Sequence, residues 1–106
     1  MTCSFTDSVV SLISGIPEGK VLTYGKIAAF AGNPRGARQV ARILHSMSKK
    51  HNLPWHRVVN SKGKISLPKP YHFAYQKKLL LQEGVEFDAQ ERLDLSRYLW
   101  EPSVSQ

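Results

Sequence analysis

The cysteine and the histidines are the residues of this sequence that could bind a metal or act as a nucleophile through sulfur. The 106 residues contain one cysteine, Cys3, and four histidines. No histidine stands at a zinc-ligand spacing from the cysteine, so we expect no metal site and no cofactor. A reactive thiol needs a neighbouring base or cation that lowers its pKa, and no matching base lies beside Cys3 in the sequence. These residues therefore give no reason to expect a metal centre or a reactive thiol.

Positive charge is the feature that points to a partner. Lys and Arg number 15 against eight Asp and Glu, which gives a formal net charge of +7 at pH 7. An excess of this size on a short chain favours a polyanion such as DNA. A generally basic, soluble surface would give the same total, so the charge has to be weighed together with the motifs.

The basic residues that could contact DNA cluster on one predicted helix, residues 34–45. Its apolar positions recur at helical spacing: Ala37, Val40, Ala41 and Leu44. Its other face carries four DNA-binding candidates: Arg35, Arg38, Gln39 and Arg42. Gly36 and Ala37 are further candidates, because small side chains permit close approach to the DNA backbone. The alternative interpretation is a solvated basic face with no partner.

A preceding helix would hold this basic face in place. Four apolar positions in the next segment back also follow helical spacing, with Thr23 before them as N-cap: Tyr24, Ile27, Ala28 and Ala31. Asn33 followed by Pro34 predicts that the second helix begins directly after the turn. Two short helices joined in this way are typical of a helix-turn-helix, whose second helix enters a groove of DNA.

The remaining segments complete a mostly α, winged helix-turn-helix-like single domain spanning residues 1–106. We expect a first helix at 4–16 capped by Ser4, and a helix at 71–83 ended by Gly84. Between them, a short strand at the β-branched end of the segment 53–59, a turn at 60–64 and a returning strand from Ile65 would form a short β-hairpin or wing. Residues 92–100 could form a helical turn or a strand, and the tail at 101–106 is expected to be flexible.

The sequence predicts an intracellular protein. No segment approaches the ~20 apolar residues that span a bilayer, and the first residues lack the pattern of a signal peptide. A single cysteine also suits a reducing compartment. We therefore expect a cytoplasmic protein with no membrane partner, associated with the nucleoid if the source is bacterial.

Three ordered motifs resemble the DNA-binding domain of the O6-alkylguanine-DNA alkyltransferases. They are Tyr24-Gly25-Lys26-Ile27-Ala28, then Gly32-Asn33-Pro34-Arg35-Gly36-Ala37-Arg38-Gln39-Val40, then Pro54-Trp55-His56-Arg57-Val58-Val59. The similarity continues through Gly63-Lys64-Ile65 and Leu79-Leu80-Leu81-Gln82-Glu83-Gly84. It covers most of residues 5–90.

One departure from the family decides the expected activity. The active alkyltransferases carry Pro-Cys-His-Arg-Val where this chain has Trp55 in place of the cysteine, while His56 and Glu83 match the family's other two catalytic positions. An indole cannot become an anionic nucleophile. The pattern is similar to that of the alkyltransferase-like proteins, which bind O6-alkylguanine without repairing it. The resemblance implies a monomeric, non-enzymatic protein that flips lesions in double-stranded DNA and flags them for nucleotide excision repair proteins.

The resemblance also implies roles for individual residues. Arg38 matches the arginine finger that fills the space left by the flipped nucleotide, and Tyr24 matches a tyrosine that helps to rotate it. The expected lesion pocket contains Trp55, Tyr24, His56, Arg57, Tyr71 and Glu83. His56 and Glu83 should keep a structural hydrogen bond, and Arg57 should hold the loop or contact phosphate. Lysines at the pocket edge are candidate DNA contacts: Lys62, Lys64 and Lys69.

Two other functional classes stay open at this point. The first is an enzyme, a glycosylase or an alkyltransferase with an unusual nucleophile. The second is a transcriptional helix-turn-helix protein, which would prefer a fixed undamaged sequence and usually bind paired half-sites as a dimer.

Overall fold

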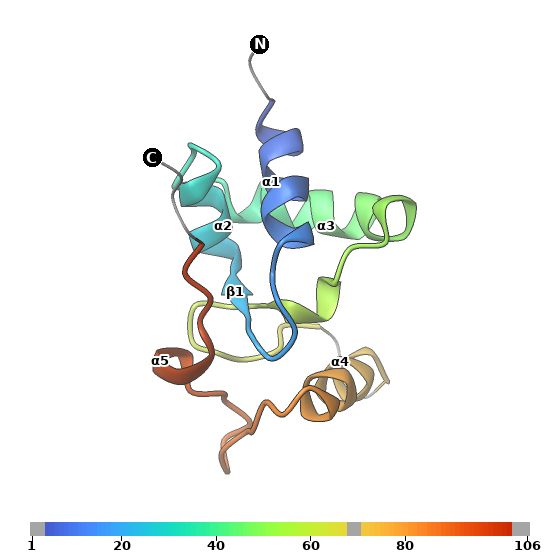
Figure 1. Ribbon diagram of the computed structural model, residues 1–106, viewed down its shortest axis with the longest axis vertical. Coiled ribbons are helices and arrows are strands. Elements are labelled where there is room, and N and C mark those ends of the chain that lie inside the picture. Colours follow the sequence, from blue (N-terminus) through green and yellow to red (C-terminus); the bar gives the residue numbers. More distant parts are fainter. Residues whose placement is uncertain (1–3, 68–70, 103–106) are drawn as a thin grey trace.

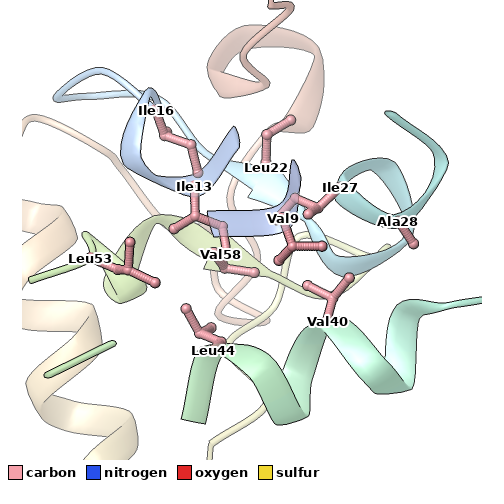
Figure 2. Close-up of a cluster of buried hydrophobic side chains, with 10 residues drawn as sticks. All are labelled: Val9, Ile13, Ile16, Leu22, Ile27, Ala28, Val40, Leu44, Leu53 and Val58. Atoms are coloured by element: carbon pink, nitrogen blue, oxygen red, sulfur yellow. The ribbon is translucent and has the colours of Figure 1, made fainter. Parts of the chain in front are cut away.

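The computed structural model describes residues 4–67 and 71–102. Three helices, α1 (Phe5–Ser14), α2 (Tyr24–Phe30) and α3 (Ala37–His51), pack together at one end of the molecule (Figure 1). They enclose an apolar core to which each helix contributes fully buried side chains (Figure 2), among them Val9, Ile27 and Val40. Burying such aliphatic side chains is the main favourable contribution to the stability of so small a domain.

The helix caps at the start of this bundle confirm the sequence analysis. The Ser4 hydroxyl accepts from the Asp7 backbone N–H at 3.1 Å, and the Thr23 hydroxyl accepts from the Lys26 N–H at 3.1 Å. Each cap satisfies one of the free N–H groups in the first helical turn.

The start and end of α3 differ from the prediction. Residues 33–36 form a turn, closed by a hydrogen bond from the Gly36 N–H to the Asn33 carbonyl at 2.9 Å, so Asn33 is not the N-cap and the helix begins at Ala37. The helix continues beyond residue 45 to His51, and Asn52 ends it in the left-handed conformation with φ 52°. The polar stretch stays helical because Met47 still packs against the core. Ala41, expected on the apolar face, is exposed.

The predicted β-hairpin is wrong. Strand β2 (Val58–Val59) pairs with β1 (Leu22–Thr23) in a parallel arrangement, with Leu22 opposite Val58. Ile65 is buried without belonging to a strand. The turn at 60–64 does form, because the Asn60 carboxamide oxygen accepts from the N–H groups of Lys62 and Lys64. The sequence showed the turn but not the partner of β2, which lies 36 residues earlier in the chain.

A second cluster joins α4 (Tyr71–Gln82) to the C-terminal segment, and it includes Leu80, Val85 and Tyr98. Gly84, at φ +90°, ends α4 as predicted: the Val85 N–H reaches the Leu80 carbonyl and the Gly84 N–H reaches the Leu81 carbonyl. These paired bonds form a Schellman motif.

Of the two interpretations of residues 92–100, the helical turn is present, and the strand is reduced to an isolated bridge. A single helical turn, α5 (Leu95–Tyr98), precedes a parallel bridge between Leu99 and Val21. In the described residues, no helix combines the length and the apolar character that crossing a membrane would require.

Candidate nucleic-acid interface

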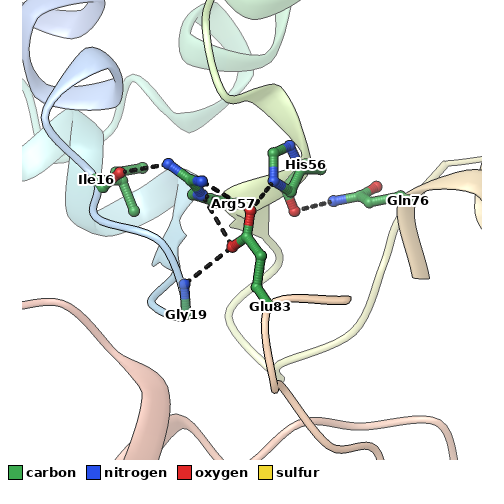
Figure 3. Close-up of polar contacts among 6 residues, drawn as sticks. All are labelled: Ile16, Gly19, His56, Arg57, Gln76 and Glu83. Carbon is green, nitrogen blue, oxygen red and sulfur yellow. Dashed lines mark hydrogen bonds and ion pairs between the residues drawn. The ribbon is translucent and has the colours of Figure 1, made fainter. Parts of the chain in front are cut away.

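Glu83 is the centre of the polar network beside the Trp55–Arg57 segment, the short 3₁₀ helix η1 (Figure 3). One carboxylate oxygen lies 2.6 Å from His56 Nε2 and 2.7 Å from Arg57 Nη2. The other accepts from Arg57 Nε at 3.0 Å and from the Gly19 backbone N–H at 2.9 Å. The hydrogen bond expected between His56 and Glu83 is therefore present.

Arg57 holds the segment in place. Besides its paired bonds to Glu83, its Nη1 donates to the Ile16 carbonyl at 2.8 Å. The guanidinium thus joins the end of α4 to the loop after α1. Planar, bidentate contact with a carboxylate is the geometry at which arginine forms its strongest pairs. Of the two roles expected for Arg57, the structure shows the one that fixes the loop.

The network lowers the pKa of Glu83 from 4.5 to about 2. Burial is the largest single influence and acts in the opposite direction, because it disfavours the charged carboxylate. Hydrogen bonds from Arg57, from the Gly19 N–H and from His56 together outweigh it, and the charge of His56 adds to them. Glu83 is therefore anionic at neutral pH, and its partners are groups of the protein itself: Arg57, His56 and the Gly19 N–H.

Gln76 is a member of this network that sequence reasoning missed. It is 2% exposed, and its Nε2 donates to the carbonyls of His56 at 3.0 Å and Val58 at 2.9 Å. The signal was available: Gln76, Leu80 and Glu83 follow at intervals of four and three residues, so they share one face of α4. A buried face of a helix that includes a glutamine needs hydrogen-bond partners on the facing segment.

Trp55 is half-buried and packs against the edge of the main core. Its ring meets His56 edge-on, with centroids 6.0 Å apart and planes at 85°, and lies 5.8 Å from the Tyr75 ring at 40°. The indole is thus held by neighbours without being sealed in the interior. An aromatic ring in this position can present a face to a planar ligand.

Tyr75, not Tyr71, is the tyrosine that accompanies Trp55. Tyr71 is 82% exposed, and in the described part of the chain no ring contact joins it to Trp55, so the prediction that it lines the pocket is not met in this structure. The two tyrosines are four residues apart and share one face of α4, so the spacing alone does not show which of them lies beside Trp55. Tyr24 is half-buried, and its hydroxyl lies 3.4 Å from the Ser66 hydroxyl.

The predicted basic surface is present on α3 and on the preceding turn. The side chains expected to contact DNA there are exposed: Arg35, Arg38, Gln39 and Arg42. Ala37 is half-buried. Gly36, however, is buried, and a Cβ there would lie 3.0 Å from the Phe5 ring and from the Asn33 side chain. This corrects the expectation that Gly36 lies at the DNA-facing surface, since internal packing accounts for the glycine.

The lysine candidates are separate from this helix. Lys62 and Lys64 are exposed in the turn after β2. Lys69 lies outside the described residues, as does Cys3. Within the described ranges, no three His, Cys, Asp or Glu side chains are grouped so as to hold a metal ion.

Two surface clefts lie away from Trp55. One, of about 680 Å³, is formed by the C-terminal segment and includes Phe87 and Tyr98. The other, of about 560 Å³, lies along α4 and includes Phe73 and Leu81. Trp55 lines neither of them.

The fold and this site are those of a known class of DNA-binding domain. The family model of the 6-O-methylguanine DNA methyltransferase DNA-binding domain matches residues 4–85, and the chain belongs to this family. It is 46% identical over 97 residues to the DNA base-flipping protein of Escherichia coli K12, over 92% of this chain and 74% of that protein. It is 39% identical over 103 residues to Alkyltransferase-like protein 1 of Schizosaccharomyces pombe, over 92% and 95% of the two chains.

Solved structures agree with the sequence comparisons. The crystal structure of S. pombe Atl1 in complex with damaged DNA containing O6-carboxymethylguanine superposes with a TM-score of 0.80 at 38% identity, covering 96% of this chain and 100% of that chain. The O6-methylguanine methyltransferase of Mycobacterium tuberculosis is also similar, with a TM-score of 0.56 at 29% identity over 78% of this chain and 50% of that chain. The resemblance identified from the motifs is confirmed.

Proposed function

We propose that this protein recognises O6-alkylguanine in double-stranded DNA, flips the damaged nucleotide against Trp55, and transfers no alkyl group. The observation that carries the proposal is the place of Trp55, next in sequence to the His56–Arg57–Glu83 network. The network is built around a carboxylate and a histidine, the groups that would orient and activate a nucleophile, but the adjoining side chain is an indole. An indole offers a stacking surface and no attacking electron pair.

The base-flipping step follows from what duplex DNA permits. A base inside the stack cannot reach a protein pocket unless its nucleotide rotates outward, at a cost of a few kcal/mol. Stacking of the flipped base on an aromatic side chain returns about 1–3 kcal/mol. The exposed Arg38 on α3 is the side chain that we assign to the vacated space in the duplex. The family, its base-flipping relative and the DNA complex of Atl1 support the flipping step.

A binding titration tests the proposal directly. Two duplexes differing only in one O6-methylguanine in place of guanine are compared at a fixed salt concentration, since salt alone changes DNA affinity strongly. We expect at least about tenfold tighter binding to the lesion, or about 1.4 kcal/mol, with the protein and oligonucleotide masses unchanged after incubation. Equal affinities would refute lesion recognition, and a methylated protein or a lost base would show an enzyme.

The same proposal assigns the protein a place before excision repair. A non-covalent complex leaves the lesion chemically intact, so removal must come from another activity that excises the damaged strand. We propose that the protein acts as a monomer and increases incision by nucleotide excision repair proteins. Sedimentation of the lesion complex and an incision assay with and without the protein measure these two points. A dimer on paired undamaged half-sites would instead indicate a transcription factor.

A further inference from the structure

Acidic side chains are absent from a long part of the sequence. Residues 19–82 contain no Asp or Glu, whereas 13 of the 15 Lys and Arg fall in this range. Six of the eight acidic residues follow it, from Glu83 to Glu101. In Figure 1 the first part of the segment after α4 lies at the lower end of the molecule, its last residues rise to the side of α2, and α3 crosses the upper half. The acidic residues are therefore segregated along the sequence, and α3 lies in the stretch that has none.

The basic side chains of α3 are ordered in register. Arg38, Arg42, His45 and Lys49 follow at intervals of four, three and four residues. At 3.6 residues per turn these four positions fall within about 60° of one another. All four side chains are exposed, and they lie opposite the buried Val40 and Leu44. We call Arg38, Arg42, His45 and Lys49 the α3 stripe.

The α3 stripe is not neutralised within the protein. Among the described residues, the ion pairs involve basic side chains of η1, α4 and the C-terminal segment, and none involves a side chain of α3. The guanidinium groups of Arg38 and Arg42 and the ammonium group of Lys49, with no acid interspersed, repel one another unless an anion lies against them. Basic residues that only complement the helix dipole are needed in the last turn of a helix alone. Arg38 and Arg42 lie well before the last turn of α3, so the dipole does not account for them.

We propose that the whole α3 stripe lies against the DNA backbone, so that His45 and Lys49 bind phosphates beyond the flipping site. The inference rests on the proposed function and adds two binding residues to it. From Arg38 to Lys49 the helix rises about 16 Å, which takes the stripe past several phosphates of one strand. The stripe would fix the direction of α3 on the duplex and thereby place Arg38 at the base stack.

Lys49 and Lys50 provide a matched pair for the test. Both are exposed at the same end of α3, and they differ by about 100° around the helix axis. Binding of the full chain to an undamaged guanine duplex is measured over a range of salt concentrations. Lys49→Gln should reduce the steepness of the dependence of log K on log salt by about 0.9 and the affinity by about threefold. Lys50→Gln should change neither, and His45→Gln should weaken binding in the same direction as Lys49→Gln.

Equal effects of Lys49→Gln and Lys50→Gln, or no effect of Lys49→Gln and His45→Gln, would overturn the inference. Urea unfolding of each variant separates a DNA contact from a contribution to helix stability, because a contact leaves the midpoint unchanged. The outcome is independent of lesion recognition, since only undamaged DNA is used. A wild-type protein that failed to distinguish O6-methylguanine from guanine would refute the proposed function and leave the α3 stripe to be judged by the Lys49–Lys50 difference.

Discussion

The rings of Trp55 and Tyr75 are neighbours, 5.8 Å apart and tilted by 40°. A base between two parallel rings requires about 7 Å, twice the ~3.4 Å spacing of stacked bases. A flipped base that stacks on this face of Trp55 therefore needs the Tyr75 ring to move outward. Tyr75 is 55% exposed, which leaves its side chain room to turn. Its backbone is fixed, because the adjacent Gln76 donates two hydrogen bonds to the segment of Trp55.

After turning outward, the Tyr75 ring would contact the flipped base or the edge of Trp55, so its replacement should weaken lesion binding. We expect Tyr75→Ala to lower the affinity for an O6-methylguanine duplex about fivefold, through loss of one ring that contacts Trp55 or the base. Affinity for the guanine duplex should not change. Tyr71→Ala, which removes the more exposed tyrosine of the same helix, is the control and should behave as wild type in both titrations. A larger loss of lesion affinity for Tyr71→Ala than for Tyr75→Ala would show that Tyr71, not Tyr75, contacts the lesion.

Arg38 and Arg42 should differ in what they recognise, although both are exposed on the α3 stripe. Arg38→Ala should weaken lesion binding by about tenfold more than undamaged binding, because the arginine that fills the flipped nucleotide's place acts only when flipping has occurred. Arg42→Ala should weaken both to the same degree, as expected for a phosphate contact. Parallel titrations of the two duplexes give these ratios. Equal losses for Arg38→Ala would show that it, too, is only a backbone contact.

The ionisation of Glu83 should make stability depend on acid pH. Its pKa is about 2 in the folded protein against 4.5 for the free side chain. The unfolded chain therefore binds the proton more readily, and the stabilisation is complete above about pH 4.5 and lost as pH falls towards 2. The shift corresponds to about 3 kcal/mol at most. Urea unfolding from pH 7 to pH 2.5 measures this contribution.

Glu83→Gln provides the matching variant. It should unfold about 3 kcal/mol more easily at neutral pH, because Arg57 loses its carboxylate in a half-buried position. The difference from wild type should shrink as the pH approaches 2. Glu18→Gln, at an exposed position, is the control and should leave the profile unchanged. A constant difference between wild type and Glu83→Gln over the whole range would show that the charge of Glu83 does not set the profile.

The sequence predicted the parts of this protein that depend on local patterns. Ser4, Thr23 and Gly84 end or begin helices where expected, since caps need only residues within one turn. The position of Trp55 beside His56 followed from motif order. The prediction of a β-hairpin failed because contacts between distant residues decide which strands pair. Strands of two residues are also too short to show an alternating pattern in the sequence. The predicted start of α3 was wrong because Asn33 is a residue type that favours both turns and helix N-caps, and here it forms a turn.

The site was predictable as a set of residues but not as a geometry. His56, Arg57 and Glu83 could be named from the resemblance, yet the convergence of Arg57 and the Gly19 N–H on one carboxylate depends on packing of α4 against η1. The same packing selects Tyr75 over Tyr71. Gln76 escaped notice because a glutamine in a helix is usually exposed, and only the three-dimensional contact shows it buried.

Gly63 joins the turn after β2 to the C-terminal segment, and its replacement should be costly. It has φ +75°, and a Cβ there would lie 2.6 Å from the Leu93 carbonyl oxygen. Gly63 and Leu93 are also joined by a hydrogen bond of 2.9 Å from the Leu93 N–H, so neither backbone can withdraw without losing it. Gly63→Ala should therefore destabilise the protein by about 3 kcal/mol, through backbone strain and the displaced contact. Thermal unfolding should show a melting temperature lower by roughly 10 °C or more.

Gly32→Ala separates the two causes, because Gly32 also has positive φ, at +98°, but nothing within 4 Å of its Cβ position. That variant should lose about 1 kcal/mol from strain alone, and equal losses in the two variants would mean that the contact with Leu93 carries no cost.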